Sequence, residues 1–449
     1  MAVFKGQWHE AIAEYSKAIE IDPKDAGTYF NRGLAYGKKG QYDQAISDFS
    51  KAIEIDPKDA WTYGSRGYAY GEKGRYDQAI ADYTKAVEID PKNAYAYFSR
   101  GYAYGLKGQY DQAISDYTKA IEVDPNEARA YDNRGYAYGE KGQYDQAISD
   151  YTKAVEIDPK DAWAYIHRGY AYGEKGQYDQ ALSDYNKALE IDPRYAEAYV
   201  NRGLAYGHKD EYDQAISDYS KAIEIDAKYA GAYFIRGYTY YKKGQHDQAI
   251  SDYTKAIEIS PRFADFYNIR GLVYSEKGRY DQAISDYTKA TEIDAGYAEA
   301  YFNRGHDYSK KGQYDQAISD YTKAIEIDPK EARAYYNRGL AYSKKGQYDQ
   351  AISDFSKVIE IDPKNAIAYF IRGLVYSEKG QYDQAIADYT KAIELNPEDA
   401  DAYNDRGRVY YLKGQYDMAW EDMHKTQNLG FQVDAEFLKE LREASGKQG

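Results

Sequence analysis

The chain has 449 residues, of which 30% are charged, and its formal net charge is -15. Such an acidic protein repels phosphate backbones and anionic membrane surfaces, so we expect no nucleic-acid partner. The sequence contains no cysteine, which excludes disulfides, thiolate nucleophiles and metals bound by sulfur.

The first element in chain order is a helix expected over residues 6–21. Ala11, Tyr15, Ala18 and Ile19 fall at helical spacing there. The segment matches the second half of the repeat that follows, so residues 1–25 are interpreted as a half repeat that lacks its first helix. The alternative is a truncated sequence or a misassigned first codon.

From residue 26 the sequence restarts every 34 residues, and twelve complete repeats fill residues 26–433. Apolar or small residues at positions 4, 8 and 11, and again from position 20 to position 30, predict two helices per repeat. In the first repeat Gly40, at position 15, can take the positive φ that ends the first helix. Pro57, at position 32, ends the second helix, and Asp59 caps the next one. Neighbouring pairs must stack to cover their apolar faces.

This unit resembles the tetratricopeptide repeat. The resemblance rests on the 34-residue period, an aromatic residue at position 4, glycine at 8, tyrosine at 11, alanine at 20, an aromatic residue at 24, alanine at 27 and proline at 32. It implies an all-α protein, an α-solenoid with a right-handed superhelix of about twelve and a half helix-turn-helix repeats and a C-terminal helix. Tyrosine replaces tryptophan at position 4, arginine replaces leucine at position 7, Ala227 and Ala295 replace the proline, and Asp210 replaces the turn glycine.

Residues 434–449 are predicted to form a last amphipathic helix and a tail, in the register of a further first helix. A lone second helix at the start and a lone first helix at the end could complete one repeat between two molecules. Such a heterologous contact generates a filament if it does not close. The alternative is an ordinary solvating cap. The residues expected in an end-to-end contact are Trp8, Ala11, Tyr15, Ala18, Ile19, Val433, Phe437, Leu438 and Leu441.

Two charged positions recur in all twelve repeats. Arginine stands at position 7, from Arg32 to Arg406, and aspartate at position 23, from Asp48 to Asp422. We expect an ion pair between the two helices of each repeat, for which the planar guanidinium is suited. A ladder of arginines that binds anions is the alternative.

A binding surface is expected from the resemblance, because tetratricopeptide proteins typically present positions 2, 5, 6, 9, 12 and 13 on a concave face. Those positions vary here and carry many apolar side chains, which usually mark a groove. Asparagine at position 6 resembles the ladder with which some family members hold a peptide backbone, although seven of the twelve repeats carry another residue. The expected groove residues are Phe30, Asn31, Leu34, Trp61, Tyr68, Tyr95, Phe98, Tyr102, Asn133, Tyr136, Trp163, Ile166, Tyr170, Asn201, Phe234, Tyr238, Phe302, Asn303, Tyr336, Asn337 and Phe370.

Position 12 divides the array into two halves. It is glycine in the first six repeats, from Gly37 to Gly207, and tyrosine or serine in the last six, from Tyr241 to Tyr411. The two halves are expected to present different grooves, or else they record a duplication without functional meaning.

No pattern in the sequence indicates catalysis. The six histidines occupy six different repeat positions, and no calcium-binding loop, phosphate-binding glycine loop or nucleophile elbow is present. We expect no enzyme activity, no metal and no cofactor.

The function predicted from these patterns is a non-enzymatic scaffold that binds a peptide or a helix of another protein in its concave groove. The alternative is a structural protein that assembles head to tail into a filament. RNA binding would need a basic inner face, whereas Lys38, Glu72, Arg129 and Glu140 are mixed in charge. No stretch approaches the ~18 apolar residues of a membrane span, and residues 1–6 lack a secretory signal. We expect a cytoplasmic protein, or an extracellular one if a signal peptide is missing.

Overall fold

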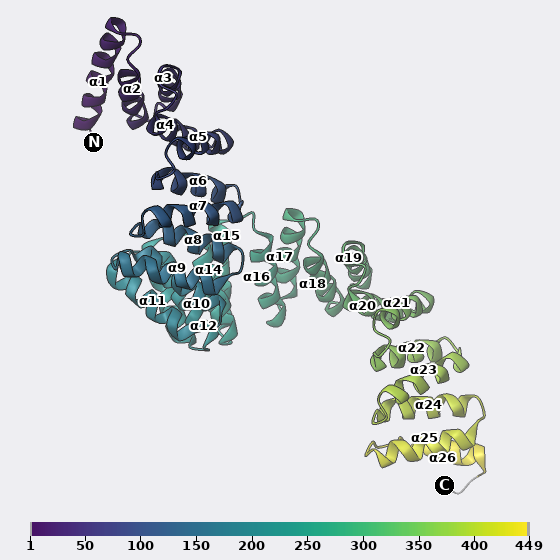
Figure 1. Ribbon diagram of the computed structural model, residues 1–449. Coiled ribbons are helices and arrows are strands. Elements are labelled where there is room, and N and C mark those ends of the chain that lie inside the picture. The colour runs from purple at the N-terminus through teal and green to yellow at the C-terminus, as the bar shows by residue number, and fades with distance from the viewer. Residues whose placement is uncertain (1, 447–449) are drawn as a thin grey trace. The chain divides into compact units, whose positions relative to one another are not determined.

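The computed structural model describes residues 2–446, with side chains from residue 7 onward, and this part of the chain contains helices and no strand (Figure 1). The all-α class predicted from the sequence is confirmed. The handedness of the superhelix stays a prediction. The helices are α1 Ala2–Ile21, α2 Ala26–Lys38, α3 Tyr42–Ile55, α4 Ala60–Glu72, α5 Tyr76–Ile89, α6 Ala94–Leu106, α7 Tyr110–Val123, α8 Ala128–Glu140, α9 Tyr144–Ile157, α10 Ala162–Glu174, α11 Tyr178–Ile191, α12 Ala196–His208, α13 Tyr212–Ile225, α14 Ala230–Lys242, α15 His246–Ile259, α16 Ala264–Glu276, α17 Tyr280–Ile293, α18 Ala298–Lys310, α19 Tyr314–Ile327, α20 Ala332–Lys344, α21 Tyr348–Ile361, α22 Ala366–Glu378, α23 Tyr382–Leu395, α24 Ala400–Leu412, α25 Tyr416–Asn428 and α26 Ala435–Ser445.

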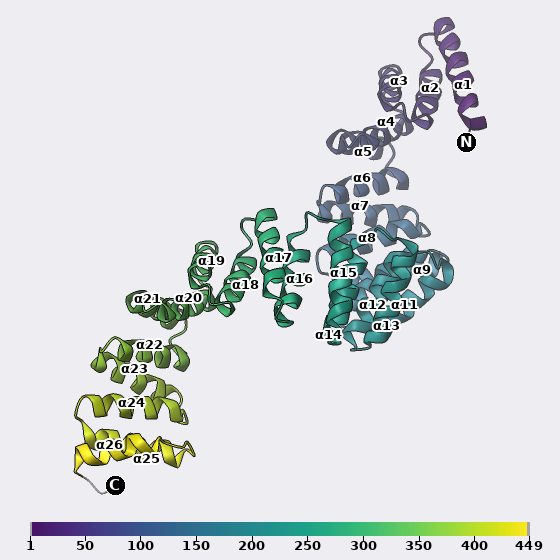
Figure 2. The ribbon, with the colours of Figure 1, turned by 180° about the vertical axis from the view of Figure 1, so that it is seen from behind.

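The chain divides into two compact units, which we call unit 1 (Met1–Ala227) and unit 2 (Lys228–Gly449). The boundary coincides with the point where position 12 changes from glycine to tyrosine or serine. Within each unit the helices follow one another as stacked pairs, seen from opposite sides in Figure 1 and Figure 2.

The turn inside each pair depends on the residue at position 15. Gly40 has φ 74°, a left-handed conformation that costs glycine little. Asp210 occupies the same position with φ 60° and is the one non-glycine residue with positive φ between residues 2 and 446. The substitution noted in the sequence therefore keeps the turn and adds backbone strain.

Close packing within a pair depends on glycine at position 8. A Cβ built on Gly33 would lie 2.7 Å from Cε1 of Phe49 at position 24. Ala45 and Ala52, which flank that ring on α3, are buried. The first helix therefore approaches the second only because no side chain stands between its backbone and the ring.

The predicted ion pair between positions 7 and 23 is confirmed in all twelve repeats. Arg32 donates from Nε and Nη2 to both carboxylate oxygens of the buried Asp48, and corresponding distances lie between 2.6 and 2.9 Å throughout. Arg32 Nη1 also donates to Ser16 Oγ on the preceding helix, at 3.0 Å. The guanidinium lies 5.8 Å from the ring centroid of Tyr29. Because internal partners occupy these arginines, the anion-binding ladder is wrong.

The last helix, α26, caps the second unit. Its residues Phe437 and Leu441 are buried with Val433 against α24 and α25, and the Phe437 ring lies 5.3 Å from that of Tyr411. Trp420 Nε1 donates to Ser445 Oγ at 3.1 Å. Leu438 is half-buried in the same cluster. Val433, Phe437 and Leu441 were expected in an end-to-end contact. That expectation is corrected, because helices of the same chain cover these three side chains.

At the other end, α1 begins at Ala2, earlier than the helix predicted over residues 6–21, and packs against α2. Five of its side chains expected in the end-to-end contact are half-buried: Trp8, Ala11, Tyr15, Ala18 and Ile19. Among the residues that the structure describes, no helix is long and apolar enough to cross a membrane.

Candidate functional site

Positions 2 and 9 of the first helices, which were expected on the inner face, carry exposed aromatic and aliphatic side chains. Trp61 is 62% exposed and Tyr170 51%, although rings of this size are usually covered in a folded protein. The expected groove residues that the structure leaves exposed are Asn31, Leu34, Trp61, Tyr68, Tyr95, Tyr102, Tyr136, Trp163, Tyr170 and Tyr238.

Position 5 serves packing more than the groove. The Phe30 ring lies 5.8 Å from that of Phe49, and the aromatic residue at position 5 meets the one at position 24 in this way in both units. The half-buried members of this set are Phe30, Phe98, Phe234, Phe302, Tyr336 and Phe370. Ile166, also at position 5, is 1% exposed, so its assignment to the groove is wrong.

The asparagines at position 6 are largely engaged within the chain. Asn133 and Asn337 donate from Nδ2 to the carbonyl oxygens of Arg129 and Arg333, one turn earlier, at 2.8 Å. Asn303 is buried and donates to Asn268 Oδ1 at 3.1 Å, so it is removed from the groove. Asn201 is half-buried and Asn31 exposed. These side chains therefore do not form a uniform ladder.

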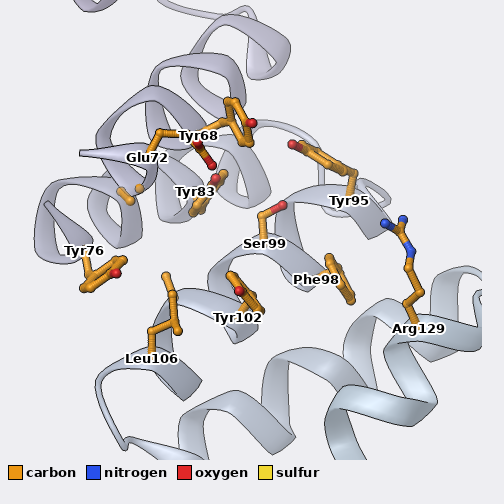
Figure 3. Close-up of a pocket in the computed structure, with 13 residues that line it drawn as sticks. Tyr68, Glu72, Tyr76, Tyr83, Tyr95, Phe98, Ser99, Tyr102, Leu106 and Arg129 are labelled. Atoms are coloured by element: carbon orange, nitrogen blue, oxygen red, sulfur yellow. The ribbon is translucent and has the colours of Figure 1, made fainter. Parts of the chain in front are cut away.

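A pocket of about 580 Å³ opens between α4, α5, α6 and α8 of unit 1. Figure 3 shows Tyr68 and Tyr95 projecting toward one another, with Phe98 and Tyr102 on the α6 side. The guanidinium of Arg129 lies 5.2 Å from the Phe98 ring centroid and is paired with Glu127 at 3.0 Å. The sequence-based set contains Tyr68, Tyr95, Phe98 and Tyr102 but not the other lining residues. Three of those omitted stand at positions 2 and 13, which were expected on the inner face: Glu72, Leu106 and Arg129.

Three glutamates at position 13 are held by tyrosines of the preceding repeat. The Tyr42 hydroxyl donates to Glu72 Oε2 at 3.1 Å, and Glu140 and Glu174 accept in the same way from Tyr110 and Tyr144 at 3.1 and 3.3 Å.

The tyrosine at position 9 lies one turn before each of these glutamates. Burial, together with the nearby carboxylate, raises the pKa of the hydroxyl of Tyr68, Tyr136 and Tyr170. The tyrosines are therefore neutral donors at physiological pH.

A histidine at position 6 of α10 joins two helices of unit 1. His167 Nδ1 lies 2.9 Å from Asp132 Oδ1 on α8, and the His167 ring lies 5.8 Å from that of Trp163. Burial lowers the pKa of His167, but the hydrogen bond and charge of Asp132 outweigh it, so the pKa is raised overall. The pair favours the imidazolium form at mildly acidic pH.

The positions of unit 2 that were expected on the inner face carry different residues. Tyr241 stands at position 12, where unit 1 has glycine, and its hydroxyl donates to Glu276 Oε1 at 2.6 Å. Position 13 carries Lys242, Lys310 and Lys344 in three of the first helices of this unit. Within residues 2–446 no group of three histidines, aspartates or glutamates could hold a metal ion.

The sequence matches three family models. One is described as TPR repeat and matches residues 4–40, 67–108, 135–176, 169–210, 237–278, 271–311, 305–346 and 373–414. Two are described as tetratricopeptide repeat and match residues 26–59, 94–127, 196–229 and 332–365, and residues 49–81, 116–149, 219–251 and 355–387. Together the matches leave no gap between residues 4 and 414. The chain belongs to the tetratricopeptide repeat family.

Several solved structures of tetratricopeptide proteins are similar to parts of this chain. YrrB, described as a TPR protein with an unusual peptide-binding site, is 29% identical over 41% of this chain and 95% of its own, with a TM-score of 0.37. MamA is 32% identical over 38% of this chain and 94% of its own, with a TM-score of 0.36. A tetratricopeptide repeat protein from Parabacteroides merdae is 21% identical over 55% of this chain and 98% of its own, with a TM-score of 0.45. No curated protein matches the chain.

Tetratricopeptide repeat proteins typically mediate protein–protein interactions and are generally non-catalytic scaffolds. The scaffold function predicted from the sequence agrees with this general property of the family.

Proposed function

We propose that the inner face of unit 1 binds an extended segment of a partner protein. The observation that carries this proposal is the row of exposed aromatic side chains that leads into the 580 Å³ pocket and includes Trp61, Tyr68, Tyr95 and Tyr102. Rigid aromatic rings supply large contact area at low cost in conformational entropy, which makes them frequent anchors of protein interfaces.

Head-to-tail assembly is supported less well than peptide binding. It needs an apolar surface at the end of the solenoid, and the apolar face of α26 is covered by α24 and α25. The aromatic groove, in contrast, has no covering element from its own chain at Trp61 or Tyr68.

Selection from a library of random peptides displayed on phage, with the full chain as target, tests this proposal. Enriched peptides should bind the unaltered protein and lose about tenfold or more in affinity with Trp61→Ala or Tyr68→Ala, because each substitution removes an anchor of about 1.5 kcal/mol or more. Phe263→Ala is the matched control, since that ring is 57% exposed in unit 2. Peptides that bind all three variants equally well would contradict a groove in unit 1.

A further inference from the structure

Unit 1 contains a recurring arrangement that we call the acidic step. It consists of tyrosine at position 9, glycine at position 12 and glutamate at position 13 of one first helix, and tyrosine at position 17 of the preceding second helix. The glutamates of the three acidic steps are Glu72 on α4, Glu140 on α8 and Glu174 on α10. The first helices at either side of this stretch carry Lys38 and His208 instead, so the steps form one bounded block.

The three glutamates differ from several recurring charged positions of the chain, which form ion pairs. Examples of these pairs are Arg66 with Asp82, Lys73 with Asp43, and Lys85 with Glu88. Among the residues that the structure describes, Glu72, Glu140 and Glu174 are exposed and form no ion pair. Each carboxylate uses one oxygen to accept from a tyrosine and keeps further lone pairs for a ligand.

The surroundings of each carboxylate suit a cation on an apolar stem. The Tyr68 ring, 48% exposed, stands one turn from Glu72, and Figure 3 shows the two side chains together at the edge of the pocket. Lysine and arginine place their aliphatic stems along aromatic rings while their charge meets a carboxylate. Tyr136 and Tyr170, 48% and 51% exposed, repeat this geometry on α8 and α10.

Glycine at position 12 keeps each step open. A Cβ built on Gly71, Gly139 or Gly173 would meet no atom within 4 Å, so space remains beside the glutamate. In unit 2 position 12 is serine or tyrosine, and the hydroxyl of Tyr241 on α14 donates to Glu276 on α16. The difference at position 12 therefore leaves more room beside the glutamates of unit 1.

The first helix between the first two acidic steps, α6, has no glutamate at position 13. On α6 position 13 is Leu106, which is 50% exposed beside Tyr102 and lines the pocket. The order along α4, α6, α8 and α10 is therefore acidic, apolar, acidic, acidic. Arg129 also reaches this face, but Glu127 neutralises it through two hydrogen bonds, at 3.0 and 3.2 Å.

We propose that unit 1 recognises an extended segment with lysine or arginine opposite α4, α8 and α10 and an apolar side chain opposite α6. Successive first helices contact one another, at a separation of about 8–10 Å, while an extended chain in the polyproline II conformation advances about 3.1 Å per residue with about three residues per turn. About every third side chain of such a segment points the same way and meets a new helix. This inference rests on the proposed peptide-binding function and specifies the chemistry of the ligand.

Fluorescence anisotropy with labelled synthetic peptides tests the inference on the full chain. The basic peptide is an otherwise alanine-based decamer with lysine at its first, seventh and tenth residues and leucine at its fourth, and a second peptide has the reverse order. The neutral peptide carries glutamine in place of each lysine, and the clustered peptide places the three lysines side by side. We expect one of the two basic peptides to bind about tenfold or more tightly than the neutral and clustered ones, with affinity that falls as salt rises.

Matched substitutions in the protein locate the effect. The triple variant Glu72→Gln, Glu140→Gln and Glu174→Gln removes the three inner charges, and Gly139→Tyr fills one step. The control triple Glu54→Gln, Glu88→Gln and Glu156→Gln removes equal charge from exposed glutamates that pair with lysines on the second helices. The inner triple should abolish the preference for the basic peptide, Gly139→Tyr should reduce it, and the control triple should keep it.

Two outcomes overturn the inference, and they differ. If the basic, neutral and clustered peptides bind equally and lose affinity only with Trp61→Ala or Tyr68→Ala, the groove binds peptides without selecting charge. If neither these peptides nor any from the phage library binds in a way that depends on the aromatic residues, the proposed function fails as well. If the inner and control triples lose affinity for the basic peptide equally, the effect depends on the net charge of the protein alone. That result would also overturn the inference.

Discussion

Ser275 Oγ donates to Asp307 Oδ1 at 2.6 Å between α16 and α18, while the other carboxylate oxygen of Asp307 has no hydrogen-bond partner among the described residues. Asp307 is completely buried at position 10, where Ala35 and most other repeats have alanine or valine. A buried carboxylate oxygen without a partner costs about 1–3 kcal/mol. The pair therefore marks a place where unit 2 is less stable than its repeat pattern permits.

We predict that Asp307→Ala stabilises unit 2 by about 1–3 kcal/mol, because it removes the unpaired group and restores the small apolar residue of the other repeats. Urea denaturation monitored by circular dichroism, with hydrogen exchange in α18, measures the change. Ser275→Ala, which removes the one donor that Asp307 has from α16, should instead destabilise the same helices. Lower stability of Asp307→Ala would show that the carboxylate is satisfied in solution.

Two glycines of α12 should respond oppositely to the same substitution. A Cβ at Gly203 would lie 2.6 Å from Cε1 of Tyr219, a buried ring, whereas a Cβ at Gly207 would lie 3.9 Å from the Tyr219 hydroxyl. Gly203→Ala should therefore cost about 1–3 kcal/mol through overpacking. Gly207→Ala should be neutral or stabilising by up to about 1 kcal/mol, because alanine favours a helix. Denaturation midpoints of the two variants measure the difference, and equal values would contradict the packing argument.

The ion pair of each repeat should be required on both sides. Arg66→Ala leaves Asp82, which is 5% exposed, without its cationic partner and should cost about 3 kcal/mol. The double variant Arg66→Leu and Asp82→Leu should be less destabilising, because it leaves no buried charge unpaired. Hydrogen exchange in α4 and α5 reports the local effect, as stability in a solenoid is a sum over neighbouring repeats. A double variant that is less stable than Arg66→Ala would argue against this account.

Contact between α8 and α10 should depend on pH through His167. Because the pKa of His167 is raised in the folded chain, its imidazolium contributes stability that is complete below the unfolded value of about 6.5 and is lost as pH rises through the folded pKa. Hydrogen exchange of the α10 amides measures this effect. The difference in protection between the unaltered chain and His167→Asn should be larger at about pH 5.5 than at about pH 8.5. A difference that does not change with pH would show that the Asp132 hydrogen bond is made by neutral histidine.

The sequence by itself determined the repeating architecture, because helix formation and stacking depend on residues a few positions apart or in the adjacent repeat. Gly40 and Pro57 marked the ends of α2 and α3, and the joint recurrence of Arg32 and Asp48 predicted their ion pair.

Only the tertiary structure decided which inner residues are available to a ligand. Phe30 and Trp61 were both expected in the groove from the sequence, yet Phe30 packs on the ring of Phe49 while Trp61 remains exposed. Asn303 and Ile166 were expected in the groove and are buried by side chains of other helices. The apolar face of α26 is likewise covered by α24 and α25. Exposure depends on how neighbouring helices pack around a position, and the period of a repeat contains only part of that information.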